Sequence, residues 1–221
     1  MTKTEALMIK SYLDQILKPG SKVVDIGSST HFYRTVQKPH IFSDIYKPIG
    51  AAESTILAVD FKQGEGIDIS GSIFEAETQA RISREKPNIL LCNNLAEHVD
   101  DKSSLLEILA GFGCEYIIFS VPFDYPYHKD PIDNLYRPGA DELALVFDGY
   151  DLAEHRLVSS GTFLDSLNEV SMHRALSRLL KEFIRIFLWI ITLNIRNLRY
   201  SRLLWLAKPY KTSVALYRKK L

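Results

Sequence analysis

The most regular feature of the chain is the alternation of short apolar runs with longer segments of helical spacing. A typical run, Ile89-Leu90-Leu91-Cys92, is apolar throughout, as in a strand buried on both faces of a sheet. In residues 102–112, by contrast, apolar side chains recur three and four positions apart, which predicts an amphipathic helix. The expected strands are 22–27, 40–46, 66–69, 89–92, 116–121, 150–160 and 212–217, with 55–59 as a loop or an extra strand. The expected helices are 4–17, 31–37, 73–85, 102–112 and 139–147.

This alternation predicts an α/β fold. Strands that alternate with helices form a parallel sheet covered on both faces. We expect a doubly wound, mostly parallel, seven-stranded Rossmann-like sheet whose last strand returns antiparallel. The expected divisions are an N-terminal helix at 1–20, a cofactor-binding core at 21–165, a basic amphipathic helical insertion at 166–208 and the final strand at 209–221. Ligands of such sheets bind beyond the carboxyl ends of the strands, so the loops after the strands carry the candidate chemistry.

The first of these loops follows the run Val23-Val24-Asp25-Ile26 and begins Gly27-Ser28-Ser29-Thr30. Glycine permits a tight turn and a close approach of the backbone to a ligand, whereas an ordinary strand-to-helix turn with a Ser/Thr cap is the alternative. Asp44 ends the short run His40–Asp44 within the expected strand 40–46, and it could accept two hydrogen bonds from a ribose diol or be a solvated aspartate at a strand end. Together these two loops resemble the arrangement by which doubly wound folds hold a nucleoside.

The third and fourth loops carry acids, amides and an imidazole. Asp68 and Ile69 end the third expected strand, where they could contact an adenine edge or simply form a turn. Asn93-Asn94 follows the strand 89–92, and Glu97-His98 comes shortly after. An imidazole at the mouth of a site can act as a base or orient a substrate, and the alternative is a hydrogen-bonded histidine at a helix end.

The fifth loop, residues 122–138, is long, contains four prolines and is rich in aromatic and ionisable side chains. Loops of this length inside a compact domain are usually functional, although a rigid surface loop with solvated charges is the alternative. Its candidate residues are His128, Tyr136 and Arg137.

Charge divides the chain into two unlike parts. The formal net charge of the 221 residues is zero, yet Arg174–Leu221 holds twelve Lys and Arg and a single acid, Glu182. The longest apolar stretch there, Ile186–Leu193, has eight residues, too few to span a bilayer. Basic residues beside a Trp-bearing apolar face suit helices that lie on an anionic membrane surface, which we expect for 174–207. The alternatives are helices that pack on the sheet or form a homodimer. Nucleic acid is not expected, since residues 186–193 are too apolar to follow phosphates.

The two cysteines indicate the compartment. Cys92 and Cys114 lie in apolar surroundings without C-x-x-C spacing, which is typical of buried reduced thiols. The first 17 residues have the pattern of an amphipathic helix and not of a signal peptide. We therefore expect a cytoplasmic protein, either free or bound peripherally at the inner face of a membrane.

Taken together, these motifs resemble class I S-adenosylmethionine (SAM)-dependent methyltransferases over about residues 20–160. VVDIGSST is similar to the glycine-rich first motif of the family, and NILLCNNLAEHVDD to its fourth-strand motif. VPFDYPYHKDPIDNLYR is similar to the loop after the fifth strand in a subgroup often found among sugar- and polysaccharide-modifying enzymes. The order and spacing of the three motifs make the resemblance more specific than any one of them.

The resemblance implies SAM as the cofactor and methyl transfer to a small molecule, sugar or lipid-linked glycan, at oxygen. The expected cofactor-binding residues are Asp25, Gly27, Ser28, Ser29, Asp44, Asp68, Ile69, Asn93 and Asn94. In the expected acceptor site, His98 or His128 acts as the base. Glu97, Tyr136 and Arg137 shape that site, and Arg137 could hold a carboxylate or phosphate. No metal is expected. The competing interpretation is a non-catalytic binding or scaffold protein of the same fold.

Overall fold

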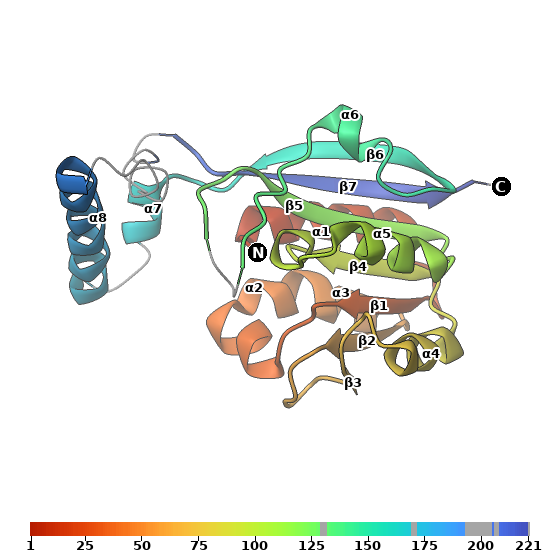
Figure 1. The fold of residues 1–221 in the computed structure, drawn as a ribbon. Helices are drawn as coiled ribbons and strands as arrows, with labels where there is room; N and C mark the ends of the chain where they lie inside the picture. The colour runs from red at the N-terminus through yellow and green to blue at the C-terminus, as the bar shows by residue number, and fades with distance from the viewer. Residues whose placement is uncertain (129–131, 169–171, 193–204, 206–207, 221) are drawn as a thin grey trace.

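A single seven-stranded sheet forms the centre of the protein (Figure 1). The structure is a computed structural model that describes residues 1–128, 132–168, 172–192, 205 and 208–220. The strand order is β3-β2-β1-β4-β5-β7-β6, in which β7 runs antiparallel to both of its neighbours, β5 and β6, and the pairs among β1 to β5 are parallel. The strands are β1 (Lys22–Ile26), β2 (Thr55–Asp60), β3 (Ile69–Ser70), β4 (Ile89–Asn93), β5 (Tyr116–Asp124), β6 (Tyr150–Ser159) and β7 (Lys211–Lys219). The expected fold class is confirmed.

Helices cover both faces of the sheet (Figure 1). On one side α1 (Lys3–Ile16) packs with η1 (Tyr33–Gln37) and, after a break at Lys38, with a continuous helical segment made of α2 (Pro39–Ile41), η2 (Phe42–Tyr46) and α3 (Lys47–Ala51). On the other side lie α4 (Ala76–Glu85), η3 (Ala96–His98), α5 (Lys102–Gly111) and α6 (Ala140–Leu143). The expected helices 73–85 and 139–147 are therefore shorter than predicted.

The central strands supply the core on both sides. In β4, Ile89 and Leu91 pack toward α1, whereas Leu90 and Cys92 pack toward α5. All four side chains are fully buried, because alternate residues of a central strand point to opposite faces and both faces are covered. This explains why the apolar run at 89–92 shows no alternation and why it was recognisable from the sequence.

The second strand was predicted in the wrong place. Residues 40–46 are helical, and β2 is formed by Thr55–Asp60, the segment left open as a loop or an extra strand. Ile41, Ile45 and Ile49 are spaced four residues apart and are buried against α1. A period of four places side chains on one face of a helix, so the spacing of these isoleucines outweighs the apolar character of the short run. The third strand also differs, because β3 comprises Ile69–Ser70 instead of 66–69.

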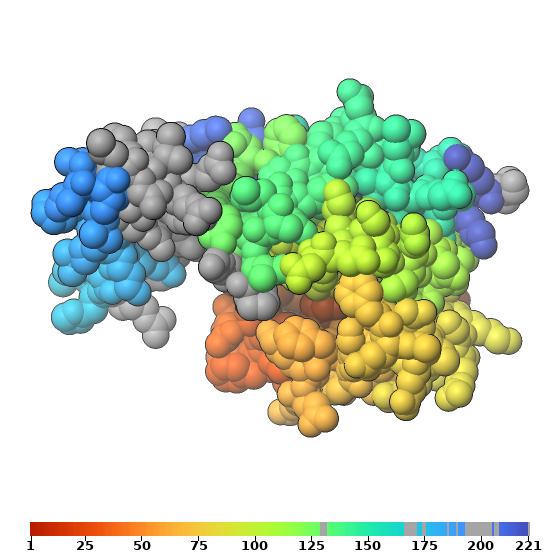
Figure 2. All heavy atoms as spheres, in the orientation of Figure 1, coloured from red at the N-terminus to blue at the C-terminus, as the bar shows by residue number. Residues whose placement is uncertain are grey.

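The helical region between β6 and β7 lies at one end of the molecule (Figures 1 and 2). It contains α7 (Phe163–Asn168) and the 21-residue helix α8 (Met172–Thr192). Among the described residues, no helix is long and apolar enough to cross a membrane. Residues 193–204, part of the expected insertion, lie outside the described residues, so the domain limits stay a prediction.

Candidate active site

The turn after β1 begins at Gly27, whose φ of +81° lies in the left-handed region. Its N–H and that of Ser28 both donate to the carbonyl oxygen of Val59, at 2.9 and 3.1 Å. Ser29 also has a positive φ, 59°, and its N–H donates to the Asp60 carboxylate at 2.8 Å. This conformation is rarely adopted by a residue other than glycine, and such strain is typical of functional loops. The loops after β1 and β2 thus form one cradle at the carboxyl edge of the sheet.

The side chain of Arg34 stabilises this cradle by hydrogen bonds to the backbone of both loops. Its side chain is 3% exposed and donates to the backbone oxygens of Ser29 and Gly66, at 3.2 and 2.6 Å. It also donates to the Tyr46 hydroxyl, which in turn donates to Asp25 at 2.5 Å. Gly66 has a φ of +75°, and a Cβ atom there would lie 2.7 Å from the Arg34 guanidinium. The arginine therefore connects the two loops with the helical segment 39–51.

Burial raises the pKa of Asp25 to about 6, although the Tyr46 hydrogen bond and the Arg34 charge act in the opposite direction. The ionised form of Asp25 is thus disfavoured in the folded protein relative to the unfolded chain. A cationic ligand next to this carboxylate would favour its ionised form.

The pKa of Asp25 predicts a specific pH dependence of stability. Since the folded pKa exceeds the unfolded one, stability from this group is fully present below about pH 4 and is lost as pH rises through 6, by on the order of 3 kcal/mol. We expect Asp25→Asn to become more stable relative to the wild type between pH 4.5 and 7.5. Urea unfolding of both proteins at the two pH values measures this change. An unchanged difference between the two proteins would contradict the assignment.

Asp60, and not Asp44, is the acid at the end of the second strand. Its carboxylate accepts from the N–H groups of Ser29 and Lys62, at 2.8 and 3.0 Å, and its side chain is 7% exposed. Asp44 lies on η2, where its carboxylate accepts from the neighbouring Ser43 hydroxyl. The premise of the Asp44 prediction, a strand end, is therefore wrong. The signal for Asp60 was present in the apolar run Thr55–Val59 that ends in an acid.

Asp68 is turned back onto the sheet. Its carboxylate accepts from the N–H of Ala58 at 2.8 Å, and its own N–H donates to the Ala58 oxygen. Ile69 is buried in the core beside it. These contacts attach the short edge strand β3 to β2, so the Asp68 side chain has a structural partner at the place where an adenine contact was predicted.

The two asparagines after β4 lie where the fourth loop begins. Asn94 has a φ of 51°, and its side-chain amide donates to Glu5 at 2.6 Å. The same Glu5 oxygen accepts from the Ser120 hydroxyl at 2.7 Å, while the other oxygen accepts from the N–H of Thr2. Asn93 keeps a buried carbonyl oxygen without a hydrogen-bond partner among the described residues. Glu5 thus anchors α1 to the ends of β4 and β5.

Removal of Glu5 should destabilise the protein. Glu5→Ala removes the acceptor of two donors, the half-buried Asn94 amide and the buried Ser120 hydroxyl, and each unpaired buried group costs about 1–3 kcal/mol. We expect a loss of about 2–4 kcal/mol in the free energy of unfolding, measured with urea. Glu5→Gln retains one acceptor oxygen, so its free energy of unfolding should fall by less than that of Glu5→Ala. Asp14→Ala, at an exposed i,i+4 ion pair on the same helix, should change stability by less than about 0.5 kcal/mol. Equal losses in Glu5→Ala and Asp14→Ala would contradict the anchoring role.

The fourth and fifth loops dock on one another and bring the predicted acceptor-site residues together. The Asn134 side chain donates to the backbone oxygens of Ala96 and Val99, both at 2.8 Å. As a result, the His98 and His128 rings meet edge to face with their centroids 5.0 Å apart. Glu97 is fully buried, and its Oε1 lies 3.7 Å from Nε2 of His98. Figure 2 shows the surface hollowed between the orange segment that follows β1 and the green segments that follow β4 and β5.

Asp133, which is not among the residues predicted for the site, organises the fifth loop. Its carboxylate accepts from the backbone of His128 and Leu135, both at 2.9 Å, and pairs with Arg137 at 2.7 Å. Nδ1 of His128 lies 3.4 Å from the same carboxylate. These contacts hold the pKa of Asp133 below its usual range despite burial, mainly through the Arg137 hydrogen bond. The sequence D-N-L-Y-R at residues 133–137 does not by itself indicate this role.

The charged state of the cluster is set by burial. Burial raises the pKa of Glu97 to about 8, and it lowers the pKa of His128 although the Asp133 charge acts in the opposite direction. Both groups are therefore driven toward their neutral forms. Such perturbed groups are common at functional sites.

Tyr136 lies close to Asp133 and Arg137 in the sequence, but its side chain packs into the core. The ring is 7% exposed and belongs to the core cluster with Phe147 and Tyr217. Nζ of Lys102 lies 3.9 Å from the ring centroid. We therefore assign Tyr136 a packing role and do not place it among the groups that face an acceptor.

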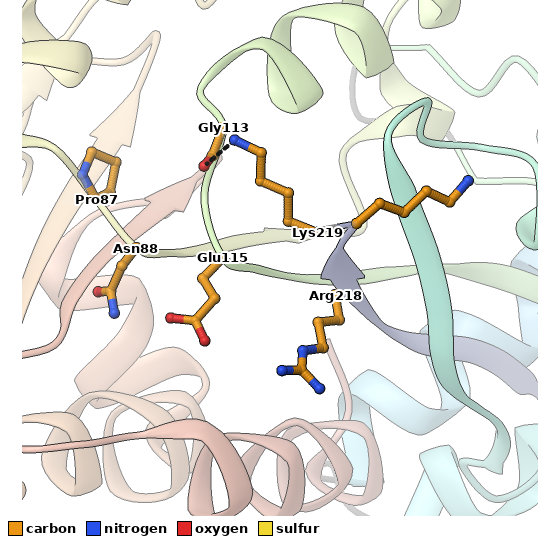
Figure 3. Close-up of a pocket in the computed structure, with 7 residues that line it drawn as sticks. Pro87, Asn88, Gly113, Glu115, Arg218 and Lys219 are labelled. Carbon is orange, nitrogen blue, oxygen red and sulfur yellow. Dashed lines mark hydrogen bonds between the residues drawn. The ribbon is translucent and has the colours of Figure 1, made fainter.

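A cavity of about 350 Å³ lies at the opposite edge of the sheet (Figure 3). Its lining comes from the residues before β4 and β5 and from the end of β7, and Lys219 donates to the Gly113 oxygen across it. We place the candidate site at the carboxyl edge instead, because the strained turns and buried carboxylates lie there.

No protein family model matches the sequence, and no curated protein matches it. Solved structures share the fold. Coclaurine N-methyltransferase bound to N-methylheliamine and SAH has a TM-score of 0.53 and 13% identity, over 97% of this chain and 72% of that chain. A candidate sarcosine dimethylglycine methyltransferase from Galdieria sulphuraria has a TM-score of 0.52 and 13% identity, over 98% and 84% of the two chains. A candidate methyltransferase from Bacillus halodurans has a TM-score of 0.51 and 13% identity, over 96% and 99%.

Proposed function

We propose that the protein is a class I SAM-dependent methyltransferase. The observation that carries the proposal is the pair of buried carboxylates, Asp25 and Asp60, on either side of the left-handed turn at Gly27. SAM carries a cationic sulfonium and an ammonium group, which a buried carboxylate attracts, and a ribose diol, which a second carboxylate can bind. The backbone of Ser28 and Ser29 completes this cradle. The fold shared with methyltransferases supports the same assignment.

In the proposed reaction the acceptor oxygen attacks the methyl carbon of SAM, and the carbon–sulfur bond breaks to leave a neutral thioether. The acceptor proton passes to Nε2 of His98 or His128, and alignment of the two substrates supplies most of the rate enhancement. Arg137 keeps its Nε without a hydrogen-bond partner in the described part of the chain, which supports a contact with an anionic group of the acceptor. Its pairing with Asp133 fixes the guanidinium in place. We propose a small-molecule, sugar or lipid-linked glycan acceptor.

Calorimetry with SAM and S-adenosylhomocysteine tests the proposal directly. We expect one molecule of either ligand to bind per chain, and an acceptor screen that follows S-adenosylhomocysteine release to identify the acceptor class. His98→Ala and His128→Ala should bind cofactor normally and lose turnover. Failure of SAM to bind would reject the methyltransferase assignment. Binding without turnover for any acceptor would favour the non-catalytic scaffold.

We also propose that α8 attaches the protein to an anionic membrane surface in the cytoplasm. Nine of its apolar side chains are 44–78% exposed, and their spacing of three and four residues places them on one face of the helix. Exposed Lys181 belongs to the basic part of the chain, and the single acid, Glu182, is only 3% exposed. An apolar face flanked by basic residues inserts into the headgroup region and is attracted by anionic lipids.

Flotation with phosphatidylcholine vesicles, with and without phosphatidylglycerol, tests this attachment. We expect binding that requires the anionic lipid and that is lost in the double variant Phe183→Asp, Phe187→Asp. Leu145→Asp, at an 85% exposed leucine outside α8, is the matched control and should float like the wild type. Absence of vesicle binding would reject the membrane role. A dimer that the double variant abolishes would identify a second copy of the chain as the occupant of this face.

A further inference from the structure

The cluster of Glu97, His98 and His128 has the composition of a metal site. One carboxylate oxygen and two imidazole nitrogens from these residues all lie within 4.8 Å of one another. The ligands of a tetrahedral zinc ion, with bonds of about 2.0–2.1 Å, lie about 3.4 Å apart. Shifts of about 1 Å in the side-chain atoms would therefore bring the three ligand atoms to the separations of a tetrahedral site.

Within the described part of the chain, the hydrogen bonds of the two histidine rings use Nδ1, which leaves Nε2 of each ring available as a metal ligand. Nδ1 of His98 lies 2.6 Å from the carbonyl oxygen of Ile132, which can only accept, so Nδ1 carries the proton. Among the described residues, Nδ1 of His128 likewise faces acceptors, the Pro126 oxygen at 3.3 Å and the Asp133 carboxylate at 3.4 Å. In the neutral rings, both Nε2 atoms then keep their lone pairs. This is the arrangement by which outer carbonyl and carboxylate groups orient metal-binding histidines.

The burial of the Glu97 carboxylate is a second feature that points to a bound ion. Its side chain is 0% exposed, and neither carboxylate oxygen has a hydrogen-bond partner among the described residues. A buried carboxylate without donors is costly, and such groups are normally paired or bound to a metal ion. The nearby guanidinium of Arg137 is directed to Asp133 instead, at 2.7 Å.

We propose that Glu97, His98 and His128 bind one divalent transition-metal ion of the zinc type. Two imidazoles and one carboxylate suit zinc, iron or nickel better than magnesium or calcium, which prefer oxygen ligands. Three protein ligands leave a coordination position open, as in catalytic metal sites. An acceptor hydroxyl at that position would lose its proton to solvent more readily, because the ion stabilises the alkoxide. In the metal-bound protein the ion thus takes the place of the histidine base.

Metal binding does not depend on the proposed methyl transfer and is measured without SAM. Chelator-treated protein is titrated with Zn²⁺ by calorimetry and with Co²⁺ by visible absorption. We expect one ion per chain and a Co²⁺ spectrum with the intense bands of a four- or five-coordinate site. Glu97→Gln and His128→Gln should each weaken Zn²⁺ binding by at least about 100-fold, and Asp133→Asn, which removes the charge of an outer partner, by about 10–100-fold.

Matched controls separate this site from surface binding. Glu107→Gln and His173→Gln, at exposed positions on α5 and α8, should bind Zn²⁺ like the wild type. Saturating Zn²⁺ should raise the melting temperature of the wild type and of these controls, but not that of Glu97→Gln. Circular dichroism confirms that each variant is folded. The proposal is overturned if the wild type binds no Zn²⁺ or Co²⁺, or if Glu97→Gln and His128→Gln bind as tightly as the wild type.

Discussion

Asp60→Ala should weaken SAM binding by about 10–100-fold, because hydrogen bonds to a charged group contribute about 1.5–3 kcal/mol. The carboxylate lies at the end of β2 and already receives the N–H groups of Ser29 and Lys62. Each carboxylate oxygen has a second lone pair that a ribose hydroxyl can use. The substitution therefore removes both a proposed ligand contact and the group that holds the Ser29 turn. Calorimetry with SAM measures the loss.

Asp44→Ala is the matched control for this prediction. Asp44 lies on η2 and its carboxylate accepts only from Ser43 among the described residues, so its removal should change SAM affinity by less than about twofold. Asp60→Asn keeps one acceptor oxygen, so its SAM affinity should lie between those of Asp60→Ala and Asp44→Ala. If Asp44→Ala weakens SAM binding and Asp60→Ala does not, Asp44 and not Asp60 binds the ribose.

Arg34→Ala should lower the free energy of unfolding by about 3–5 kcal/mol, the cost of removing one partner from a buried charged network. The guanidinium stacks over the Tyr46 ring with 4.3 Å to its centroid and binds the loops after β1 and β2. Its loss leaves the carbonyl oxygens of Ser29 and Gly66 without their donor. It also removes the positive charge that favours ionised Asp25.

Urea unfolding at pH 7.5 measures this effect. Arg34→Lys keeps the charge but not the forked geometry, so we expect it to recover only part of the loss. Arg84→Ala, at an exposed arginine of α4, is the control and should change stability by less than about 0.5 kcal/mol. A loss in Arg34→Ala no greater than in Arg84→Ala would show that the network does not support the cradle.

Elements that are buried on both faces were the easiest to predict. The runs at 89–92 and 116–121 consist of apolar residues because helices cover both sides of β4 and β5. The antiparallel return of β7 was also predicted, from the strand character of 212–217, and is confirmed. In each case the local pattern and the tertiary environment agree.

The region 40–60 shows where local pattern was insufficient. The run His40–Asp44 is apolar enough for a strand, and so is Thr55–Val59, and both end in an acid. The choice between them depends on which segment pairs with β1 and which packs against α1. That choice also decides which aspartate ends the second strand, so the wrong strand led to Asp44 as the predicted ribose contact, whereas the observed strand end leads us to propose Asp60.

By itself, then, the sequence determined the layered α/β architecture, the turn at Gly27 and the residue types of the site, because hydrophobic period and glycine conformation are local properties. Only the tertiary structure decided which side chains meet. The contact between His98 and His128 depends on the docking of Asn134 onto the loop after β4, and the place of Asn94 depends on Glu5 from α1. Such contacts join residues that are distant along the chain, so their geometry follows from packing and from the pairing of buried polar groups.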